Sequence, residues 1–445
     1  MSFKAYHYCN YDQNSVKYAK NKDIIMFPNL LNGKKILLGV TGSISIYKSL
    51  ELIRLYIKSG AEVRVVMSES AKKFITPLTF ETISMNKVLH GDTESWDNDL
   101  NHIKIGSWAD IFVIAPASAN TIAKLSNAIA DNLLLQTALA FPGEKLLCPS
   151  ANTNMINNPI ILHSTKMLAL SNYTIINTQK KLLACNTEGD GALADIEDIF
   201  FRTTQILLRE EFWVNRHVIV TGGGTIEKID DVRYLSNFSS GKMGSSLALA
   251  LFFKGADVDF ISSKFPQRLP CEIHQVEVKS TKEMKNHLIH SINVAKHGRM
   301  RESISVDESN SELIQKKPFL FMAAAVSDYI PLLPQQGKLK KSDIGEQWSL
   351  DLKKNEDLLS CIDTKGVCTI GFKAEMDPQA GFNNAKAMLE KKGLQAVCYN
   401  LLTDSTSFGS DDNALEFITK EGSVGLPNQD KLTLSLKLLE LCEEL

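Results

Sequence analysis

One unit of local structure is predicted twice in this chain, and it restricts the fold more than any other feature of the sequence. The first copy begins with an apolar strand over 34–40 that ends in a glycine turn, and it continues with a helix over 49–58. Gly60 ends this helix, and a β-rich strand follows over 61–67. A strand, turn, helix and strand in this order build a parallel sheet.

The second copy has the same order of elements. It is predicted as a strand over 217–220, a glycine turn over 221–225, a helix over 241–254 stopped by Gly255, and a strand over 258–262. Because 445 residues are about three times the usual domain size, each copy has room for its own core. The sequence therefore predicts an α/β protein with two doubly wound, Rossmann-like domains.

Charge and hydropathy exclude several classes of partner. The 49 Lys and Arg residues nearly balance the 51 Asp and Glu residues, so the net charge of −2 leaves no surplus of cations for a nucleic acid. Apolar runs such as 247–253 are much shorter than the roughly 18 residues that span a bilayer, so no membrane partner is expected. Residues 1–22 lack the apolar region of a secretory signal, which indicates a cytoplasmic protein.

The cysteines do not indicate a metal centre. All eight are scattered, with no CxxC pair and no clustered histidines that would complete a zinc site. We therefore assign no metal-ligating residues and expect any important cysteine to act as a single thiol.

The first glycine turn, 39–45, has the composition of a phosphate site. It would present backbone N–H groups and hydroxyls at the start of a helix, where an anion is favoured. The turn lacks the full GxGxxG pattern, and Met67 closes the second strand where a dinucleotide site prefers an acidic residue. A phosphate monoester such as FMN therefore suits the turn better than NAD. A packing turn without a ligand is the alternative.

Four further segments agree with a flavin site. They are 101–110, 116–124, 149–155 and 183–191. Together with the first turn they resemble the FMN-dependent decarboxylases that act on peptidyl or pantothenoyl cysteine, which implies a flavodoxin-like FMN domain. Ala151 and Ile156 depart from the usual motif of that family, where Met and Trp are common.

The resemblance implies roles for three residues of the first domain. His102 would be the catalytic base, Asn152 would hold the substrate carboxylate, and Cys185 would donate the proton that completes the reduction. Each has a structural alternative, since a lone His is often a surface residue, an Asn often caps a turn, and a lone Cys is often buried. The FMN-binding positions implied by the resemblance are Gly42, Ser43, Ser68, Ser118, Ala119 and Asn120.

The second half of the chain carries its own set of motifs. These are 221–225, 233–244, 321–329, 337–341, 353–357, 371–375 and 409–413. In this order they are similar to the phosphopantothenate–cysteine ligases, which implies a CTP-binding ligase domain. With the first half, the whole chain resembles the bacterial bifunctional enzymes of coenzyme A synthesis.

This second resemblance implies activation of 4′-phosphopantothenate by CTP to an acyl-cytidylate, which the amine of L-cysteine then attacks. Lys338 would face the charge that develops on the phosphoryl oxygens, with Mg²⁺ held mainly by the CTP phosphates. Asn237 would help to turn over the acyl-cytidylate. The alternative for Lys338 is a solvated basic turn. The positions implied to bind CTP are Met322, Ala323, Ala324, Asp328, Lys338, Asn355, Phe372 and Lys392.

One CTP contact departs from the family. Met388 stands where a lysine is usual, four residues before Lys392, so a contact with the triphosphate is missing. Lys386 or Lys391 could replace it.

Domain boundaries follow from these matches. We predict an N-terminal extension over 1–33, the decarboxylase domain over 34–205 and the ligase domain over 215–445, joined by an amphipathic helix over 206–212. The polar segment 293–317 is predicted to be an inserted loop or an extension. By resemblance, the protein would be a homo-oligomer larger than a dimer.

Two other functions remain open from the sequence. The first is a single-activity FMN-dependent peptidyl-cysteine decarboxylase, which the second half of the chain disfavours. The second is a non-catalytic flavin-binding regulatory subunit, which the presence of His102, Asn152 and Cys185 disfavours.

Overall fold

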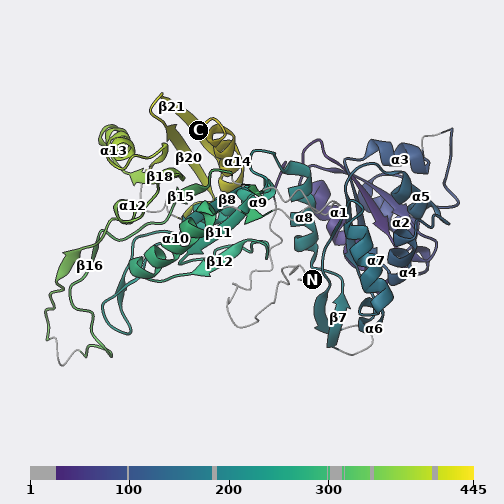
Figure 1. Ribbon diagram of the computed structural model, residues 1–445, viewed down its shortest axis with the longest axis horizontal. Coiled ribbons are helices and arrows are strands. Elements are labelled where there is room, and N and C mark those ends of the chain that lie inside the picture. Colours follow the sequence, from purple (N-terminus) through teal and green to yellow (C-terminus); the bar gives the residue numbers. More distant parts are fainter. Residues whose placement is uncertain are drawn as a thin grey trace. The chain divides into compact units, whose positions relative to one another are not determined.

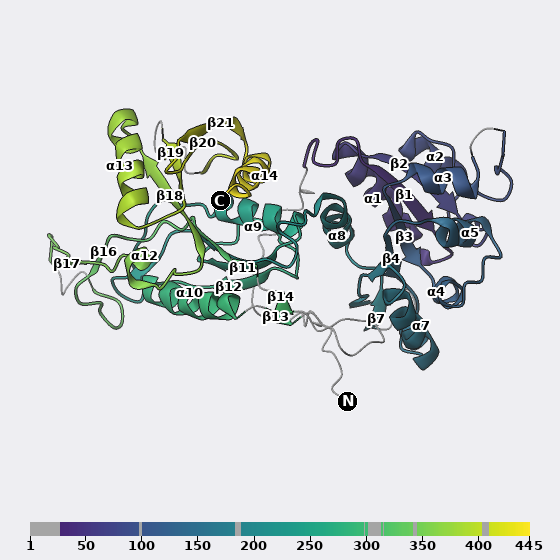
Figure 2. The ribbon, with the colours of Figure 1, turned by 45° about the horizontal axis from the view of Figure 1, so that its top comes forward.

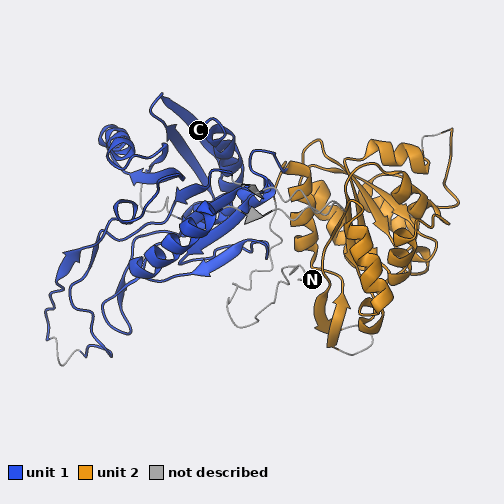
Figure 3. Cartoon of the chain, in the orientation of Figure 1, with its two compact units in different colours: residues 1–21, 209–445 blue, residues 22–208 orange. Residues whose placement is uncertain are grey.

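The described chain divides into two compact units, one up to Leu208 and one from Arg209 onward (Figure 3). The computed structural model describes residues 27–97, 100–182, 188–297, 299–300, 313–314, 316–340, 345–402 and 409–445. Each unit contains its own sheet and its own core.

The first unit is built on a five-stranded sheet in which all strands are parallel. The order is β2-β1-β3-β4-β5, with bounds β1 Lys35–Val40, β2 Glu62–Met67, β3 Ile111–Ala117, β4 Lys145–Pro149 and β5 Tyr173–Ile175. Every residue of β3 is buried, as expected for a central strand covered on both faces. This is the flavodoxin-like strand order, which confirms the predicted fold class.

Helices cover both faces of this sheet (Figure 1). Leu37, Phe112 and Ile114 pack on one face with α3, α4, α5 and α7. The helices α1 and α8 contact each other, where the hydroxyls of Tyr56 in α1 and Thr203 in α8 share a 2.7 Å hydrogen bond. The helices are α1 Tyr47–Lys58, α2 Pro77–Ser84, α3 His102–Trp108, α4 Ala119–Ser126, α5 Leu133–Ala140, α6 Thr153–Ile156, α7 Pro159–Ala169 and α8 Ile196–Leu208, and a hairpin joins β6 Gln179–Leu182 to β7 Glu188–Ala192.

The predicted helix over 206–212 is wrong in its position. α8 ends at Leu208, and the apolar residues after it belong to the second unit. Trp213 is fully buried there, with its ring 5.1 Å from that of Phe319 and its indole N–H donating to Glu443. Apolar spacing alone cannot show which of two cores a side chain enters.

Packing of the first unit begins before the boundary predicted at Lys34. Leu31 is fully buried, and the ring of Phe27 stacks on that of Phe200 in α8 at 6.1 Å. Residues 27–33 therefore contribute to this core.

The second unit contains an eight-stranded sheet. Six adjacent strands, from β12 to β19 in the sheet, pair in parallel, whereas β20 pairs antiparallel with both β19 and β21. The order is β12-β11-β8-β15-β18-β19-β20-β21. The bounds are β8 His217–Gly222, β11 Asp257–Ser262, β12 His274–Glu277, β15 Phe319–Met322, β18 Cys368–Glu375, β19 Ala396–Leu401, β20 Asp412–Ile418 and β21 Ser423–Asp430. The six parallel strands follow the doubly wound Rossmann order, as the sequence predicted.

Helices cover both faces of this sheet, and successive side chains along each strand point to opposite faces (Figure 2). Ile219 and Ile261 pack with α10 on one face, whereas Phe260 lies against Gly244 of α9 on the other. The helices are α9 Lys242–Phe253, α10 Thr281–Lys296, α12 Leu358–Cys361, α13 Pro378–Lys391 and α14 Lys431–Cys442. Two-stranded pairs join β9 Glu227–Lys228 to β10 Tyr234–Leu235, β13 Arg299–Met300 to β14 Leu313–Ile314, and β16 Tyr329–Pro331 to β17 Leu352–Lys354.

The predicted loop over 293–317 is only partly correct. α10 continues through Lys296, and the short antiparallel pair β13 and β14 closes the segment. Most of the remainder lies outside the described residues. Within the described chain, no helix combines the length and the apolar character needed to cross a membrane.

An aspartate flanked by two histidines joins three strands of the second unit. Asp259 on β11 contacts His217 Nε2 at 3.1 Å and His274 Nδ1 at 3.0 Å, and Asp257 lies 3.3 Å from His217 Nδ1. Burial alone would raise the pKa of Asp259, but its hydrogen bonds to His217 and His274 hold that pKa well below the usual range. The hydrogen bond to Asp259 raises the pKa of His274.

These shifts make stability depend on pH in opposite directions. The lowered pKa of Asp259 contributes stability above the unfolded value of about 3.9, and this contribution is lost as the pH falls. The raised pKa of His274 contributes stability that is complete below about 6.5 and lost as the pH rises through its folded value.

We therefore expect Asp259→Asn to be most destabilising between about pH 4 and pH 6.5, by about 1.5–3 kcal/mol, because it removes hydrogen bonds to a charged group. Urea unfolding curves across the pH range would measure this. The control is Asp363→Asn, an exposed carboxylate paired with Lys296, which should change stability little at any pH. A pH-independent loss in Asp259→Asn would contradict the prediction.

Candidate functional site

Both sheets reverse their strand order at one place, and ligands of doubly wound folds bind at the carboxyl ends of the strands there. In the first unit the reversal lies between β1 and β3, and in the second unit it lies between β8 and β15. Each unit therefore has one edge at which a site is expected.

Hydroxyl groups link three strand ends at the first of these edges. Thr41, after β1, donates to the Pro116 carbonyl at 2.7 Å and accepts from the Ser118 amide at 2.9 Å. After β4, the Ser150 hydroxyl lies 2.7 Å from that of Ser45 and accepts from Ser43 at 3.3 Å. The turn that the sequence predicted as a phosphate site is thus rich in hydroxyls and fixed in place.

Two further features of this edge concern the turn and a buried hydroxyl. A Cβ at Gly42 would lie 2.7 Å from Ser70 Cβ, so this position must stay bare for the turn to close. The Ser68 hydroxyl is buried and has no hydrogen-bond partner among the described residues. Ala119 is buried at the start of α4, whereas Asn120 is exposed. The unsatisfied hydroxyl of Ser68 fits a polar partner such as a phosphate.

The residues expected to act on substrate begin short helices. His102 is the first residue of α3, and its Nδ1 lies 3.1 Å from Glu94 Oε1. Asn152 is the N-cap of α6, and its side chain accepts a hydrogen bond from the Asn154 amide at 2.9 Å. Asn152 follows Ser150, which contacts the turn, by two residues. Cys185 lies outside the described residues.

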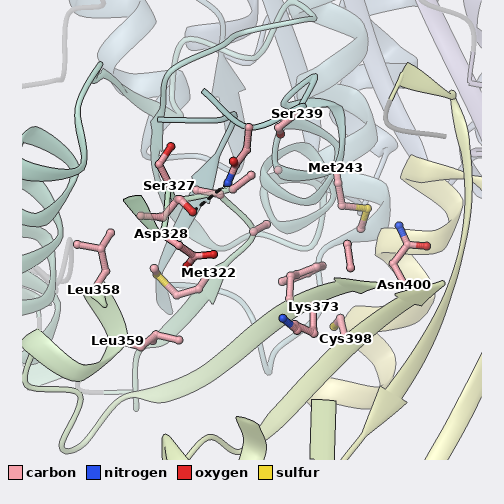
Figure 4. A pocket seen from close by; sticks show the side chains of 18 of the residues that line it. Ser239, Met243, Met322, Ser327, Asp328, Leu358, Leu359, Lys373, Cys398 and Asn400 are labelled. Carbon is pink, nitrogen blue, oxygen red and sulfur yellow. Dashed lines mark hydrogen bonds between the residues drawn. The ribbon is translucent and has the colours of Figure 1, made fainter. Parts of the chain in front are cut away.

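In the second unit, a pocket of about 910 Å³ opens at the predicted edge (Figure 4). It is lined by residues from the ends of the adjacent strands β15 and β18 and from the start of α9. The residues implied by resemblance that line it are Asn237, Met322, Ala323, Ala324, Asp328, Asn355, Phe372 and Lys392.

Some of the expected residues are elsewhere. Lys338 is on an exposed loop and is not among the described residues that line this pocket. Lys386 and Lys391 are exposed on α13, whereas Met388 lines the pocket, with its methyl group close to Gly371. Neither lysine is among the described residues that line the pocket, so a substitution for the usual lysine stays a prediction.

A polar network supports the wall of the pocket. The Asn355 side-chain amide donates to the Thr281 hydroxyl at 2.9 Å and to the Ser327 carbonyl at 2.7 Å. Thr281 donates in turn to Glu227 at 2.6 Å, and the Ser327 amide donates to Thr225 at 3.1 Å. Asn355 is therefore held in a fixed position at the pocket, facing a site that several strands build together.

Charged groups of both signs meet at the pocket. Lys392 forms a 2.8 Å ion pair with Asp357. Burial alone would raise the pKa of Asp357, but the hydrogen bond from Lys392 lowers it overall. Burial lowers the pKa of Lys431. Among the residues described, no three His, Cys, Asp or Glu side chains gather to hold a metal ion.

A smaller pocket of about 450 Å³ adjoins Asn237, Ser239 and Ser240. Lys264 lines it and donates to the Ser239 carbonyl at 2.7 Å. The sequence analysis missed Lys264, because it lies in the loop after β11 and no motif includes it. It also missed Glu94, whose only sequence signal is a carboxylate eight residues before His102.

Comparisons with known families cover both units. Residues 27–208 match the family model described as Flavoprotein. Residues 213–298 and 289–445 match the model described as the C-terminal domain of the DNA/pantothenate metabolism flavoprotein.

Curated relatives extend along nearly the whole chain. The chain is 34% identical to the coenzyme A biosynthesis bifunctional protein CoaBC of Haemophilus influenzae, over 92% of this chain and 97% of that protein. It is 32% identical to the protein of the same name from Bacillus subtilis, over 92% of this chain and 97% of that protein. A solved structure of a PPC decarboxylase mutant complexed with pantothenoylaminoethenethiol is 30% identical, covers 38% of this chain and 96% of its own, and has a TM-score of 0.35.

The close approach of α9 to β8 shapes the larger pocket and can be tested directly. A Cβ at Gly244 would lie 3.0 Å from both Gly222 Cα and the Thr221 carbonyl oxygen. We therefore expect Gly244→Ala to lower the free energy of unfolding by about 1–3 kcal/mol, because the helix start must move away from the strand. Urea unfolding would measure the loss. Gly425→Ala is the control, since nothing lies within 4 Å of that position, and equal stability of both variants would contradict the expected crowding.

Proposed function

The chain belongs to the family of coenzyme A biosynthesis bifunctional proteins named CoaBC, and from this premise we propose that it catalyses two reactions of that synthesis. Its second unit joins 4′-phosphopantothenate to L-cysteine with CTP, through an acyl-cytidylate. Its first unit decarboxylates the product, phosphopantothenoylcysteine, to 4′-phosphopantetheine with FMN. The observation that carries the proposal is similarity to these relatives across both units of one chain.

The first unit has the features that an FMN site needs. Gly42 and Ser43 would face the phosphate, and the unsatisfied hydroxyl of Ser68 would gain a partner. Ser118, Ala119 and Asn120, at the start of α4, would bind the remainder of the cofactor. When bound, FMN supplies the reversible oxidation of the substrate thiol that makes loss of CO₂ possible.

The residues of this unit then handle protons and orient substrate. His102 accepts a proton from the substrate, and Asn152 holds the substrate carboxylate, which must be placed correctly before it leaves as CO₂. Cys185 returns a proton at the end of the reaction.

The second unit would bind CTP in its larger pocket. The backbone of 322–324, with Asp328, Asn355 and Phe372, would bind the nucleotide, and Lys392 would face its phosphates. Mg²⁺ would be held mainly by those phosphates. Fixed cations that face the charge developing on a phosphoryl group lower the barrier to its transfer. Lys338 would supply one such cation from its exposed loop. Asn237 would help to turn over the acyl-cytidylate.

Other parts of the proposal concern the state of the protein in the cell. We place it in the cytoplasm, as a homo-oligomer larger than a dimer, a size that light scattering measures directly. The pocket of the second unit disfavours a protein that is only a peptidyl-cysteine decarboxylase or only a flavin-binding regulatory subunit.

A combined assay tests the function. The purified protein should be yellow, and it should release CMP only when CTP, 4′-phosphopantothenate and cysteine are all present. His102→Asn should stop release of CO₂ from supplied phosphopantothenoylcysteine and leave release of CMP unchanged, since the two sites belong to separate units. A parallel fall in CMP release would show that the assignment of one reaction to each unit is wrong.

Lys338→Gln should remove one cation from phosphoryl transfer without disturbing the fold, because the side chain is exposed. We expect acyl-cytidylate formation to slow by about a hundredfold or more, equivalent to roughly 3 kcal/mol of transition-state stabilisation. Flavin content and decarboxylation of supplied phosphopantothenoylcysteine should stay normal.

The matched control is Lys365→Gln, another exposed lysine in a turn of the same unit. A ligase rate for Lys338→Gln within about threefold of the parent, as expected for the control, would assign Lys338 to the solvated surface.

A further inference from the structure

The ring of His102 has two neighbours that no sequence motif includes. Its Nδ1 lies 3.1 Å from Oε1 of Glu94, and the side chains of His102 and Glu94 are 22% and 28% exposed. The ring of Trp96 meets that of His102 edge-on, with 5.6 Å between their centroids. In the part of the chain that the structure describes, His102 Nε2 has no hydrogen-bond partner. One ring nitrogen is thus engaged, and the other is open.

Backbone hydrogen bonds fix the segment that carries Glu94. The Glu94 amide donates to the His90 carbonyl at 3.2 Å, and the Ser95 amide donates to the Leu100 carbonyl at 2.9 Å. After this bridge, the side chain of Asn101 accepts from the first amides of α3, which sets the start of the helix at His102. The carboxylate and the imidazole are therefore presented to each other by ordered backbone on both sides.

We propose that Glu94 is a positioning residue for His102, an inference that rests on the proposed role of His102 as the base of the decarboxylation. An ionised carboxylate can only accept hydrogen bonds, so the Nδ1 that faces it must carry the ring proton. This fixes the tautomer in which Nε2 has a free lone pair. The substrate S–H bond then breaks as its proton moves to Nε2, and Glu94 stays ionised beside the imidazolium that forms.

A second histidine of the same segment has a different arrangement. Nδ1 of His90 accepts a hydrogen bond from the Asp92 amide at 3.3 Å, so in the neutral ring that nitrogen carries no proton. The Asp92 carboxylate lies 3.5 Å from the same Nδ1, farther than Glu94 lies from Nδ1 of His102, and it is 78% exposed. His90 and His102 thus have opposite tautomers, and of these two histidines only His102 has a partly buried carboxylate as the hydrogen-bond partner of Nδ1.

The tautomer can be observed directly. In protein labelled with ¹⁵N on histidine, with His102 assigned by His102→Asn, the neutral ring should carry its proton on Nδ1. Glu94→Ala should distribute that proton over both nitrogens, and Glu94→Asp should restore Nδ1–H in part. Asp92→Asn, the matched control, should leave the spectrum of His102 unchanged. A parent ring protonated on Nε2, or no change in Glu94→Ala, would overturn the proposal.

Kinetics separates this inference from the proposed function. We expect Glu94→Ala to lower kcat for decarboxylation about a hundredfold, with KM within about threefold and normal flavin content, because orientation of a base affects chiefly the chemical step. Glu94→Asp should recover part of kcat. If His102→Asn decarboxylates normally, the proposed base is wrong. If His102→Asn is inactive while Glu94→Ala keeps the parent rate and tautomer, only the role of Glu94 is wrong.

Discussion

The reversal of strand order in each sheet is the constraint on which both candidate sites depend. At the reversal, the connections from two adjacent parallel strands leave toward opposite faces, so the carboxyl ends of β1 and β3, and of β8 and β15, are not covered by the helices that follow them. Backbone groups at these ends still need partners. In the first unit Thr41 supplies them by bridging Pro116 and Ser118. In the second unit, the Ala325 amide donates to the Gly223 carbonyl, and the Thr225 amide donates to the Ala325 carbonyl.

The two edges differ in the chemistry they offer to an anion. The first gathers neutral hydroxyls, of which Ser43, Ser45 and Ser150 form a connected group, and such donors suit a phosphate that remains bound as part of a cofactor. The second combines a pocket of about 910 Å³ with lysines that already have partners, such as Lys392 with Asp357. Paired cations can exchange one anionic partner for another, which suits a triphosphate that must enter and leave.

The sequence predicted what depends on local pattern and missed what depends on which chain segments meet. Glycine turns after buried strands located both edges, for two different reasons. Gly223 has a positive φ that few other residues adopt, whereas a Cβ at Gly42 would collide with Ser70. The helix over 206–212 was misplaced because burial of Trp213 is decided by Phe319, about a hundred residues away. Glu94 was missed for a related reason, since only the bridge between Ser95 and Leu100 folds its carboxylate back onto His102.

Hydrogen bonds hold the backbone of the loop that carries Lys338, although its side chain is exposed. The residues on either side of it are held, since the Gly337 amide donates to Asp231 at 2.7 Å and the Leu339 amide donates to Asp230 at 3.2 Å. Burial alone would raise the pKa of Asp230, but hydrogen bonds from Arg233 and from nearby backbone amides hold it well below its usual range. Arg233 also donates to the Leu339 carbonyl at 2.8 Å. These contacts fix the backbone on both sides of Lys338 and leave its side chain exposed, so a substitution of this lysine tests the ammonium group and not the fold.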